Sequence, residues 1–173
     1  MGILLVAAVA TVVGFLLILL IGRNQPVSPA AIDRPDAVRA SELDWVRGFG
    51  VEGFQRLLLT LFTEMGFQAE RSERGSHTVD LFANDPTPIK GGRLYVRGVL
   101  TPGGAALGDD EVRNLIETFR AESVGKGVLV TLGAFTGEAR DAARGNPVDL
   151  VDGDALGKLM KKHLPQAYAT RKV

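Results

Sequence analysis

An uninterrupted apolar run at residues 2–22 constrains this chain more than any other feature. It reads GILLVAAVATVVGFLLILLIG, carries no charge, and has Thr11 as its only polar side chain. About 20 apolar residues in a helix cross a hydrocarbon core roughly 30 Å thick. Backbone groups in lipid must be satisfied within such a helix, so the run predicts a single membrane-spanning helix. A cleaved signal peptide is the alternative, but it needs a basic start and a shorter apolar stretch.

The residues after the run predict its orientation and a linker. No basic side chain precedes the run, whereas Arg23, Arg34 and Arg39 follow it. The positive-inside rule then places the C-terminal part in the cytoplasm, below the cell membrane. Residues 23–41 contain three prolines and no apolar period, which indicates a semi-extended linker.

Charge and cysteine content exclude several classes of function for the remainder. The chain has 20 basic and 20 acidic residues, without the basic excess typical of a dedicated nucleic-acid binder. It has no cysteine, which excludes disulfides, thiolate metal sites and a cysteine nucleophile. We predict a folded domain at residues 42–165 and a basic tail at residues 166–173.

Apolar periodicity predicts an α/β domain with a mixed central sheet flanked by helices. Residues 51–65 are amphipathic at helical spacing, and Leu58 is predicted to be buried. Short strands close enough for hairpins follow, and later strands, with Val130 in a buried one, alternate with helices. Such alternation implies parallel pairing through right-handed crossovers. The expected order is helix 51–65, strands 67–70, 77–83 and 93–100, helix 109–122, strand 127–131, helix 136–144, strand 148–151 and helix 154–163.

Four phrases of this domain resemble the restriction-endonuclease-like domain of the Mrr type. That domain belongs to the type IV restriction endonucleases, within the PD-(D/E)xK nuclease superfamily. The phrases span most of the domain, and the last two are the most distinctive. They are FQRLLLTLFTEMGF at residues 54–67, HTVDLFA at 77–83, GVLVTLGAFTGEA at 127–139 and VDLVDGDAL at 148–156.

The resemblance implies DNA binding and Mg²⁺-dependent cleavage, with carboxylates holding the metal. Asp80 matches the family's strand aspartate and is the one candidate metal ligand. Gln55 stands where the family has a Glu on its first helix. On the third strand, Tyr95 stands where the family has an acid or Gln, and Arg97 stands where the family has a Lys. A guanidinium stays protonated and does not replace an amine, and one carboxylate holds Mg²⁺ poorly. The implied active site is therefore degenerate, and we do not expect it to bind Mg²⁺. We also expect Asp80, Tyr95 and Arg97 to converge on one face of the sheet, with Gln55 facing them from the first helix.

Other polar residues allow alternative interpretations to a degenerate active site at Asp80. Asp85 and Lys90 form a relocated site in one alternative, and ordinary turn residues in the other. The aspartates of residues 149–154 suggest either a metal site or a strand end and a helix cap. The basic residues between Lys158 and Lys172 indicate either phosphate contacts or a solvated helix end.

Two main functions follow from these observations. The first is a membrane-tethered, DNA-binding domain of the Mrr-like fold with a degenerate nuclease site. The second is a membrane-anchored protein-interaction module with no nucleic-acid role, which the neutral net charge favours. A basic face around Arg93, Arg97 and Lys126 would support DNA binding, whereas an exposed apolar patch would support a protein partner.

Overall fold

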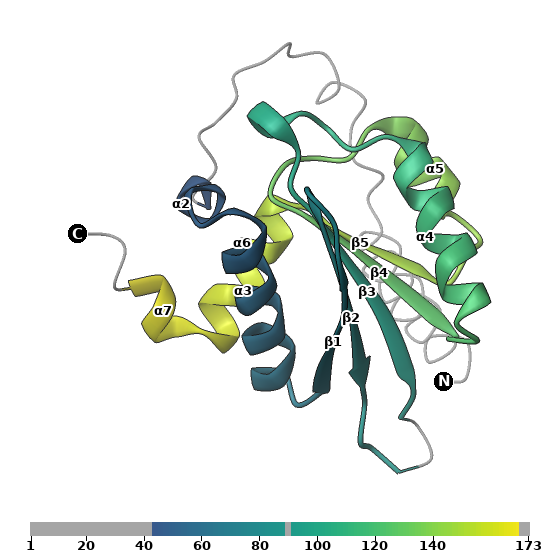
Figure 1. The fold of residues 1–173 in the computed structure, drawn as a ribbon, viewed down its shortest axis with the longest axis horizontal. Coiled ribbons are helices and arrows are strands. Elements are labelled where there is room, and N and C mark those ends of the chain that lie inside the picture. Colours follow the sequence, from purple (N-terminus) through teal and green to yellow (C-terminus); the bar gives the residue numbers. More distant parts are fainter. Residues whose placement is uncertain (1–42, 89–90, 170–173) are drawn as a thin grey trace, which may run out of the picture. The chain divides into compact units, whose positions relative to one another are not determined.

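A computed structural model of the chain describes residues 43–88 and 91–169, and their core is a single five-stranded sheet (Figure 1). The strands lie side by side in chain order, with β1–β2 and β2–β3 antiparallel and β3–β4 and β4–β5 parallel. Their bounds are Gln68–Arg74 for β1, Thr78–Asn84 for β2, Arg93–Val99 for β3, Lys126–Thr131 for β4 and Val148–Val151 for β5.

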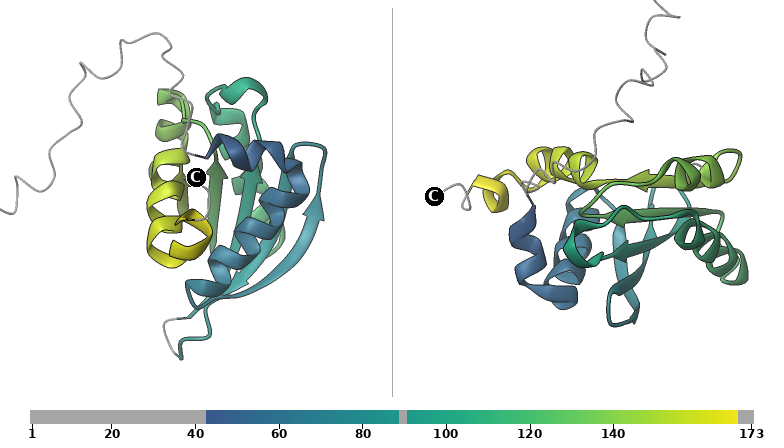
Figure 2. Two further views of the ribbon diagram at one scale, coloured as in Figure 1. Left: turned by 90° about the vertical axis from the view of Figure 1, so that its left-hand side faces the viewer. Right: turned by 90° about the horizontal axis from the view of Figure 1, so that it is seen from above.

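Helices cover both faces of this sheet (Figures 1 and 2). One layer holds α3 (Gly50–Glu64) and α6 (Gly153–His163), and the opposite layer holds α4 (Asp109–Ala121) and α5 (Gly137–Ala143). Shorter segments are α2 (Asp44–Gly48), the 3₁₀ turn η3 (Pro102–Gly104) and α7 (Pro165–Ala169). The predicted α/β class with a mixed sheet flanked by helices is confirmed.

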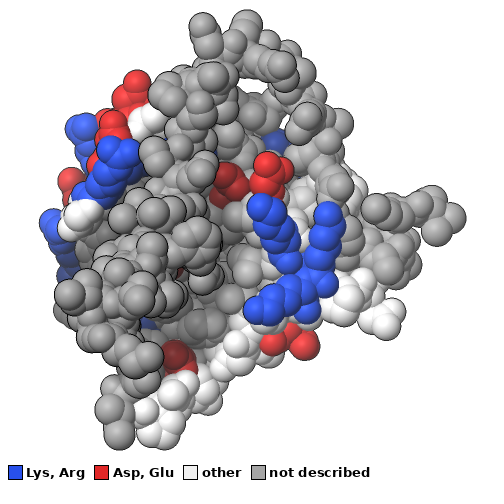
Figure 3. Space-filling view, turned by 180° about the vertical axis from the view of Figure 1, so that it is seen from behind, with Lys and Arg blue, Asp and Glu red and all other residues white. Residues whose placement is uncertain are grey.

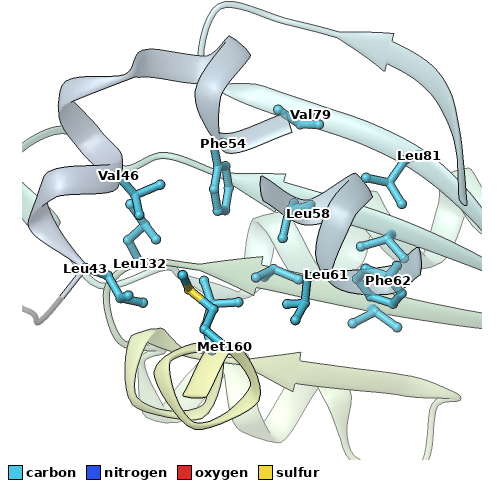
Figure 4. Packing of buried hydrophobic residues seen from close by; sticks show 14 of the residues in the cluster. Leu43, Val46, Phe54, Leu58, Leu61, Phe62, Val79, Leu81, Leu132 and Met160 are labelled. Atoms are coloured by element: carbon cyan, nitrogen blue, oxygen red, sulfur yellow. The ribbon is translucent and has the colours of Figure 1, made fainter. Parts of the chain in front are cut away.

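Alternating side chains of the strands feed two separate hydrophobic cores. On one face, Val79 and Leu81 of β2 pack with Leu58 of α3 and with Met160 of α6 (Figure 4). On the other face, Phe82 of β2 packs with side chains of α4 and α5. We call these the α3 core and the α4 core. Successive residues of a strand point to opposite faces, so a β2 side chain belongs to one core or to the other.

Burial of the two predicted core residues is confirmed, because Leu58 is 0% and Val130 1% exposed. Most predicted elements lie within one or two residues of the observed ones. The largest difference is β1, which continues to Arg74 because it pairs with β2 from Asn84 back to Val79 across an irregularity in register. The sequence analysis missed α2, and α7 occupies residues that it assigned to the basic tail.

Capping explains where the later helices begin and supports the cap interpretation of the aspartates near β5. The Thr136 hydroxyl accepts a hydrogen bond from the backbone N–H of Ala139 at 3.2 Å, at the start of α5. Asp152 accepts one from the N–H of Ala155 at 2.9 Å, at the start of α6. Such side-chain caps satisfy backbone donors that the first helical turn leaves unpaired.

The predicted membrane helix at residues 2–22 and linker at 23–41 lie outside the described residues. Within residues 43–88 and 91–169, no helix is both long and apolar enough to cross a bilayer.

Candidate functional site

The two central antiparallel strands bring Asp80 and Arg97 together on the α4 face of the sheet. The two residues are direct partners in the β2–β3 register. The Arg97 Nε donates to one carboxylate oxygen of Asp80 at 2.7 Å, and its Nη2 donates to the other at 3.0 Å. Both carboxylate oxygens are therefore engaged in a two-point ion pair, the geometry that a planar guanidinium favours.

Tyr95 completes this cluster from two residues earlier on β3. Arg97 Nη2 lies 3.3 Å from the Tyr95 hydroxyl oxygen and donates to it. The Tyr95 ring meets the ring of Phe82 edge to face, with centroids 5.3 Å apart. Arg93 stacks over Phe82 at 3.6 Å from the ring centroid. The predicted convergence of Asp80, Tyr95 and Arg97 on one face is confirmed by these contacts.

Burial and charge shift the pKa values of Arg97 and Tyr95. Only 9% of the Asp80 side chain and 14% of the Arg97 side chain are exposed. Burial by itself would lower the pKa of Arg97, but the hydrogen bonds and negative charge of Asp80 outweigh it and raise that pKa further above its usual range. Burial, together with the nearby Asp80 charge, raises the pKa of Tyr95 to about 12. Arg97 is thus a permanent cation, and Tyr95 a neutral phenol, at physiological pH.

The expectation that Gln55 faces these three residues is corrected. Gln55 lies on α3, and it is 4% exposed. The neighbouring Phe54 packs in the α3 core, directly against Gly98 of β3, where an added Cβ would clash with the Phe54 ring. Gly98 and Arg97 are adjacent in the strand and point to opposite faces. The sheet therefore lies between α3 and the Asp80 carboxylate.

A carboxylate that the sequence analysis missed lies on the same face as Asp80. Glu70 of β1 pairs with Phe82 of β2, so its side chain shares the Asp80 face and is exposed. It is the diagonal neighbour of Asp80, at a Cα separation of about 7–8 Å. No motif identified it, because β1 was predicted to be short and its register with β2 was unknown.

The alternative of a relocated catalytic site at Asp85 and Lys90 gains no support from Asp85, the one of the two residues that the structure describes. Asp85 accepts hydrogen bonds from the backbone N–H and the hydroxyl of Thr87, at 2.9 and 2.5 Å. These hydrogen bonds lower its pKa, as expected for a carboxylate that caps a turn. Asp85 lies about 16 Å along the strand direction from Asp80, and Lys90 lies outside the described residues.

The donor set around Asp80 does not fit Mg²⁺, the metal that the family resemblance implies. Mg²⁺ requires near-octahedral oxygen ligands, and the two oxygens of Asp80 already accept from Arg97. Among the residues that the structure describes, no three His, Cys, Asp or Glu side chains form a group that could hold a metal ion. A cation at Asp80 would also lie beside the Arg97 charge.

An open cleft of about 510 Å³ begins two residue pairs beyond the Asp80–Arg97 pair. Thr78 and Val99, partners in the β2–β3 register, form part of its wall. His77 and Glu111 contribute the titratable side chains, and Glu111 comes from the first turn of α4. No sequence pattern predicts this cleft, because the β2–β3 hairpin and α4 meet only in the folded chain.

Comparison with known proteins gives one family and several related folds. Residues 46–160 match the family Mrr_cat, described as restriction endonuclease. The DNA modification-dependent restriction endonuclease AspBHI is similar in structure, with 18% identity, a TM-score of 0.57, and coverage of 80% of this chain and 38% of that chain. The MspJI restriction endonuclease, solved in complex with a 27-mer oligonucleotide, aligns at 16% identity and a TM-score of 0.48, over 84% of this chain and 38% of its own. This chain therefore spans less than half the length of either enzyme, and no curated protein matches it.

Proposed function

The chain belongs to the Mrr_cat restriction endonuclease family, and from this premise we propose that it is a membrane-tethered DNA-binding domain whose nuclease site is inactive. The single observation that carries the inactive site is the ion pair in which Arg97 engages both carboxylate oxygens of Asp80. It closes the position where family members hold the metal that polarises phosphate and activates water. The scaffold and the adjacent cleft remain for binding.

The chemistry of the cluster supports loss of hydrolysis. An active site of this type needs a negatively charged metal site and a lysine near the attacking water. Here a permanently charged guanidinium neutralises the one family carboxylate, and Tyr95 supplies a phenol in place of an acid. Glu70 adds a second carboxylate to the face, but it lies on the edge strand and away from the Arg97 side.

The test of inactivity is nicking of supercoiled plasmid by the purified protein with Mg²⁺ or Mn²⁺. We expect no nicking above that of an Asp80→Ala variant. The variant Tyr95→Glu/Arg97→Lys restores an acid and an amine at the family spacing, and we expect it to gain Mn²⁺ binding by calorimetry. Tyr95→Gln/Arg97→Gln is the matched control, which removes the same side chains without adding a carboxylate. The proposal of an inactive site would be wrong if the natural chain nicks DNA and either Asp80→Ala or Glu70→Ala abolishes that nicking.

DNA binding itself is tested by the salt dependence of duplex affinity. Phosphate contacts release counterions, so the affinity should fall steeply as salt rises. The first variant to compare is Arg93→Gln, because Arg93 is exposed at the rim of this face. Affinity that does not respond to salt, or no affinity at low salt, would refute this part of the proposal.

Membrane tethering through residues 2–22, with the domain in the cytoplasm, is part of the same proposal. It rests on the length of the apolar run and on the arginines that follow it. Full-length protein should stay with membranes through alkaline extraction, and protease added to the cytoplasmic side should digest the domain. Recovery in the soluble fraction, or digestion only from the other side, would contradict it.

A membrane-anchored protein-interaction module remains the second candidate, and one observation favours it. Two of the three basic residues expected to face DNA are paired internally, Arg97 with Asp80 and Lys126 with Asp149 at 2.6 Å. Paired cations offer less charge to phosphates than free ones do. Absence of salt-dependent DNA affinity, together with intact membrane tethering, would favour this module over the DNA-binding domain.

A further inference from the structure

An apolar groove lies on the outer side of the layer that holds α2, α3, α6 and α7. Its volume is about 490 Å³, and its apolar lining includes Trp45, Phe49, Leu57 and Leu164. Phe49 is 46% exposed and is the one exposed large hydrophobic side chain among the described residues. It meets Trp45 edge to face, with ring centroids 5.8 Å apart. The Phe49 ring is thus presented at the surface beside Trp45, which is half-buried and packs against the α3 core.

The local backbone holds Phe49 in this exposed position. Phe49 joins α2 to α3, and it caps the start of α3. One turn later stands Gly53, where an added Cβ would lie only 2.1 Å from the Phe49 Cβ. The absence of a side chain at Gly53 therefore lets the Phe49 ring lie over the first turn of α3, at the edge of the groove.

One basic side chain lines this groove, and three more lie on α6, the helix that ends just before Leu164. Arg56 of α3 lines it directly. Lys158, Lys161 and Lys162 of α6 are exposed, and their spacing places them on one side of the helix, away from the buried Met160. Leu164, which lines the groove, follows Lys161 by less than one turn. Figure 3 shows Lys and Arg side chains gathered on the surface where α6 lies.

The groove lies close in the chain to the proposed membrane anchor. Trp45 lies in the first described helix, directly after the linker that follows the apolar run. The roughly 20 residues of that linker can span at most about 70 Å. If residues 2–22 are in a bilayer, the groove is held at a high effective concentration next to the lipid surface, so weak contacts suffice.

We propose that the surface formed by Trp45, Phe49, Arg56 and the three α6 lysines docks on the interface of an anionic lipid bilayer. Tryptophan and phenylalanine favour the boundary between headgroups and acyl chains, and lysine and arginine are attracted to anionic headgroups. The docked domain lies with α3 and α6 toward the membrane. The Asp80 face, on the other side of the sheet, then faces away from it. This inference rests on the proposed tethering but not on DNA binding.

The single tryptophan of the chain makes the test direct. The full chain is reconstituted into vesicles that contain phospholipids brominated in their acyl chains, and Trp45 fluorescence is measured. One set of vesicles is phosphatidylcholine alone, and the other includes phosphatidylserine. We expect quenching of Trp45 in the anionic vesicles and its loss when salt is raised. Alkaline extraction of the same vesicles reports membrane insertion of residues 2–22, so failure of the anchor is distinguished from failure of the docking surface.

Matched variants test whether the named residues are responsible. Lys158→Gln/Lys161→Gln/Lys162→Gln should weaken docking by roughly 100-fold, at about five-fold for each charge. Arg113→Gln/Arg120→Gln/Arg144→Gln removes equal charge from α4 and the end of α5, in the opposite helix layer, and should leave quenching unchanged. Phe49→Ser should reduce quenching while circular dichroism stays native.

Several results would overturn the proposal. These are equal quenching in both lipid compositions, equal loss in both triple variants, or no quenching in vesicles where the anchor is inserted. If Trp45 fluorescence instead shows no response to anionic lipid, a change on addition of duplex DNA would assign the groove to DNA, and a change with protein concentration would assign it to a second copy of the chain.

Discussion

Breaking the Asp80–Arg97 pair from one side should destabilise the domain far more than replacing both partners. Asp80→Asn keeps the size of the side chain but leaves the Arg97 guanidinium, which is only 14% exposed, without its counter-charge. Removing one partner of a buried pair costs about 3–5 kcal/mol, and the residual exposure here places the expected loss near 3 kcal/mol. Arg97→Met should cost a similar amount because it strands the Asp80 carboxylate.

The double variant Asp80→Leu/Arg97→Met separates pairing from packing. Hydrophobic replacement of a buried pair is often neutral or stabilising, so we expect the double variant to unfold within about 1 kcal/mol of the natural domain. With Asp80→Leu and Arg97→Met as the matching single variants, the coupling energy should exceed about 2 kcal/mol, which marks directly interacting residues. The exposed pair of Arg144 and Asp141, at 2.9 Å, is the control, and Asp141→Asn should cost less than about 0.5 kcal/mol.

The assay is urea unfolding of the compact unit Val38–Val173, followed by circular dichroism. With a urea dependence of about 1.5 kcal/mol per molar, a loss of 3 kcal/mol lowers the midpoint by about 2 M. Single variants that cost less than about 0.5 kcal/mol, or variants whose effects simply add, would show that Arg97 does not hold Asp80 in solution. The Asp80 carboxylate would then be available to a metal ion.

Three further predictions concern ionisation, packing and capping. In a Tyr168→Phe background, absorbance at 295 nm should show that Tyr95 ionises near pH 12. Because the folded pKa of Tyr95 is raised, the stability that this residue contributes is complete below about pH 10 and is lost as the pH rises toward 12. An ionisation midpoint near pH 10 would contradict the burial of Tyr95. Leu58→Ala should lower the free energy of unfolding by about 2–4 kcal/mol, since Leu58 is 0% exposed in the α3 core, and a loss under about 0.5 kcal/mol would contradict that placement. Thr136→Ala should cost about 1 kcal/mol through loss of the α5 cap, whereas Thr136→Ser should restore most of it; equal losses would exclude the hydroxyl as the cause.

The sequence alone determined the parts of the fold that depend on neighbours along the chain. Helical spacing of apolar residues located α3, acidic residues in the first turn marked the start of α4, and Thr136 marked the start of α5 through a local cap. Short apolar runs located the strands, and local phrases carried the family resemblance that the match over residues 46–160 confirms. These signals are local, because caps and amphipathic periods are set within one or two turns.

Contacts between side chains distant in sequence depend on the folded arrangement of the strands and helices. Asp80 and Arg97 are 17 residues apart, and their pairing depends on a strand register in which a shift of one residue would turn one side chain to the other face. The same alternation places α3, and with it Gln55, on the opposite face from Asp80. It also brings Glu70 of β1 onto the Asp80 face. The aromatic groove likewise exists only because α2 and the α6–α7 segment meet across α3, a long-range contact that no local pattern specifies.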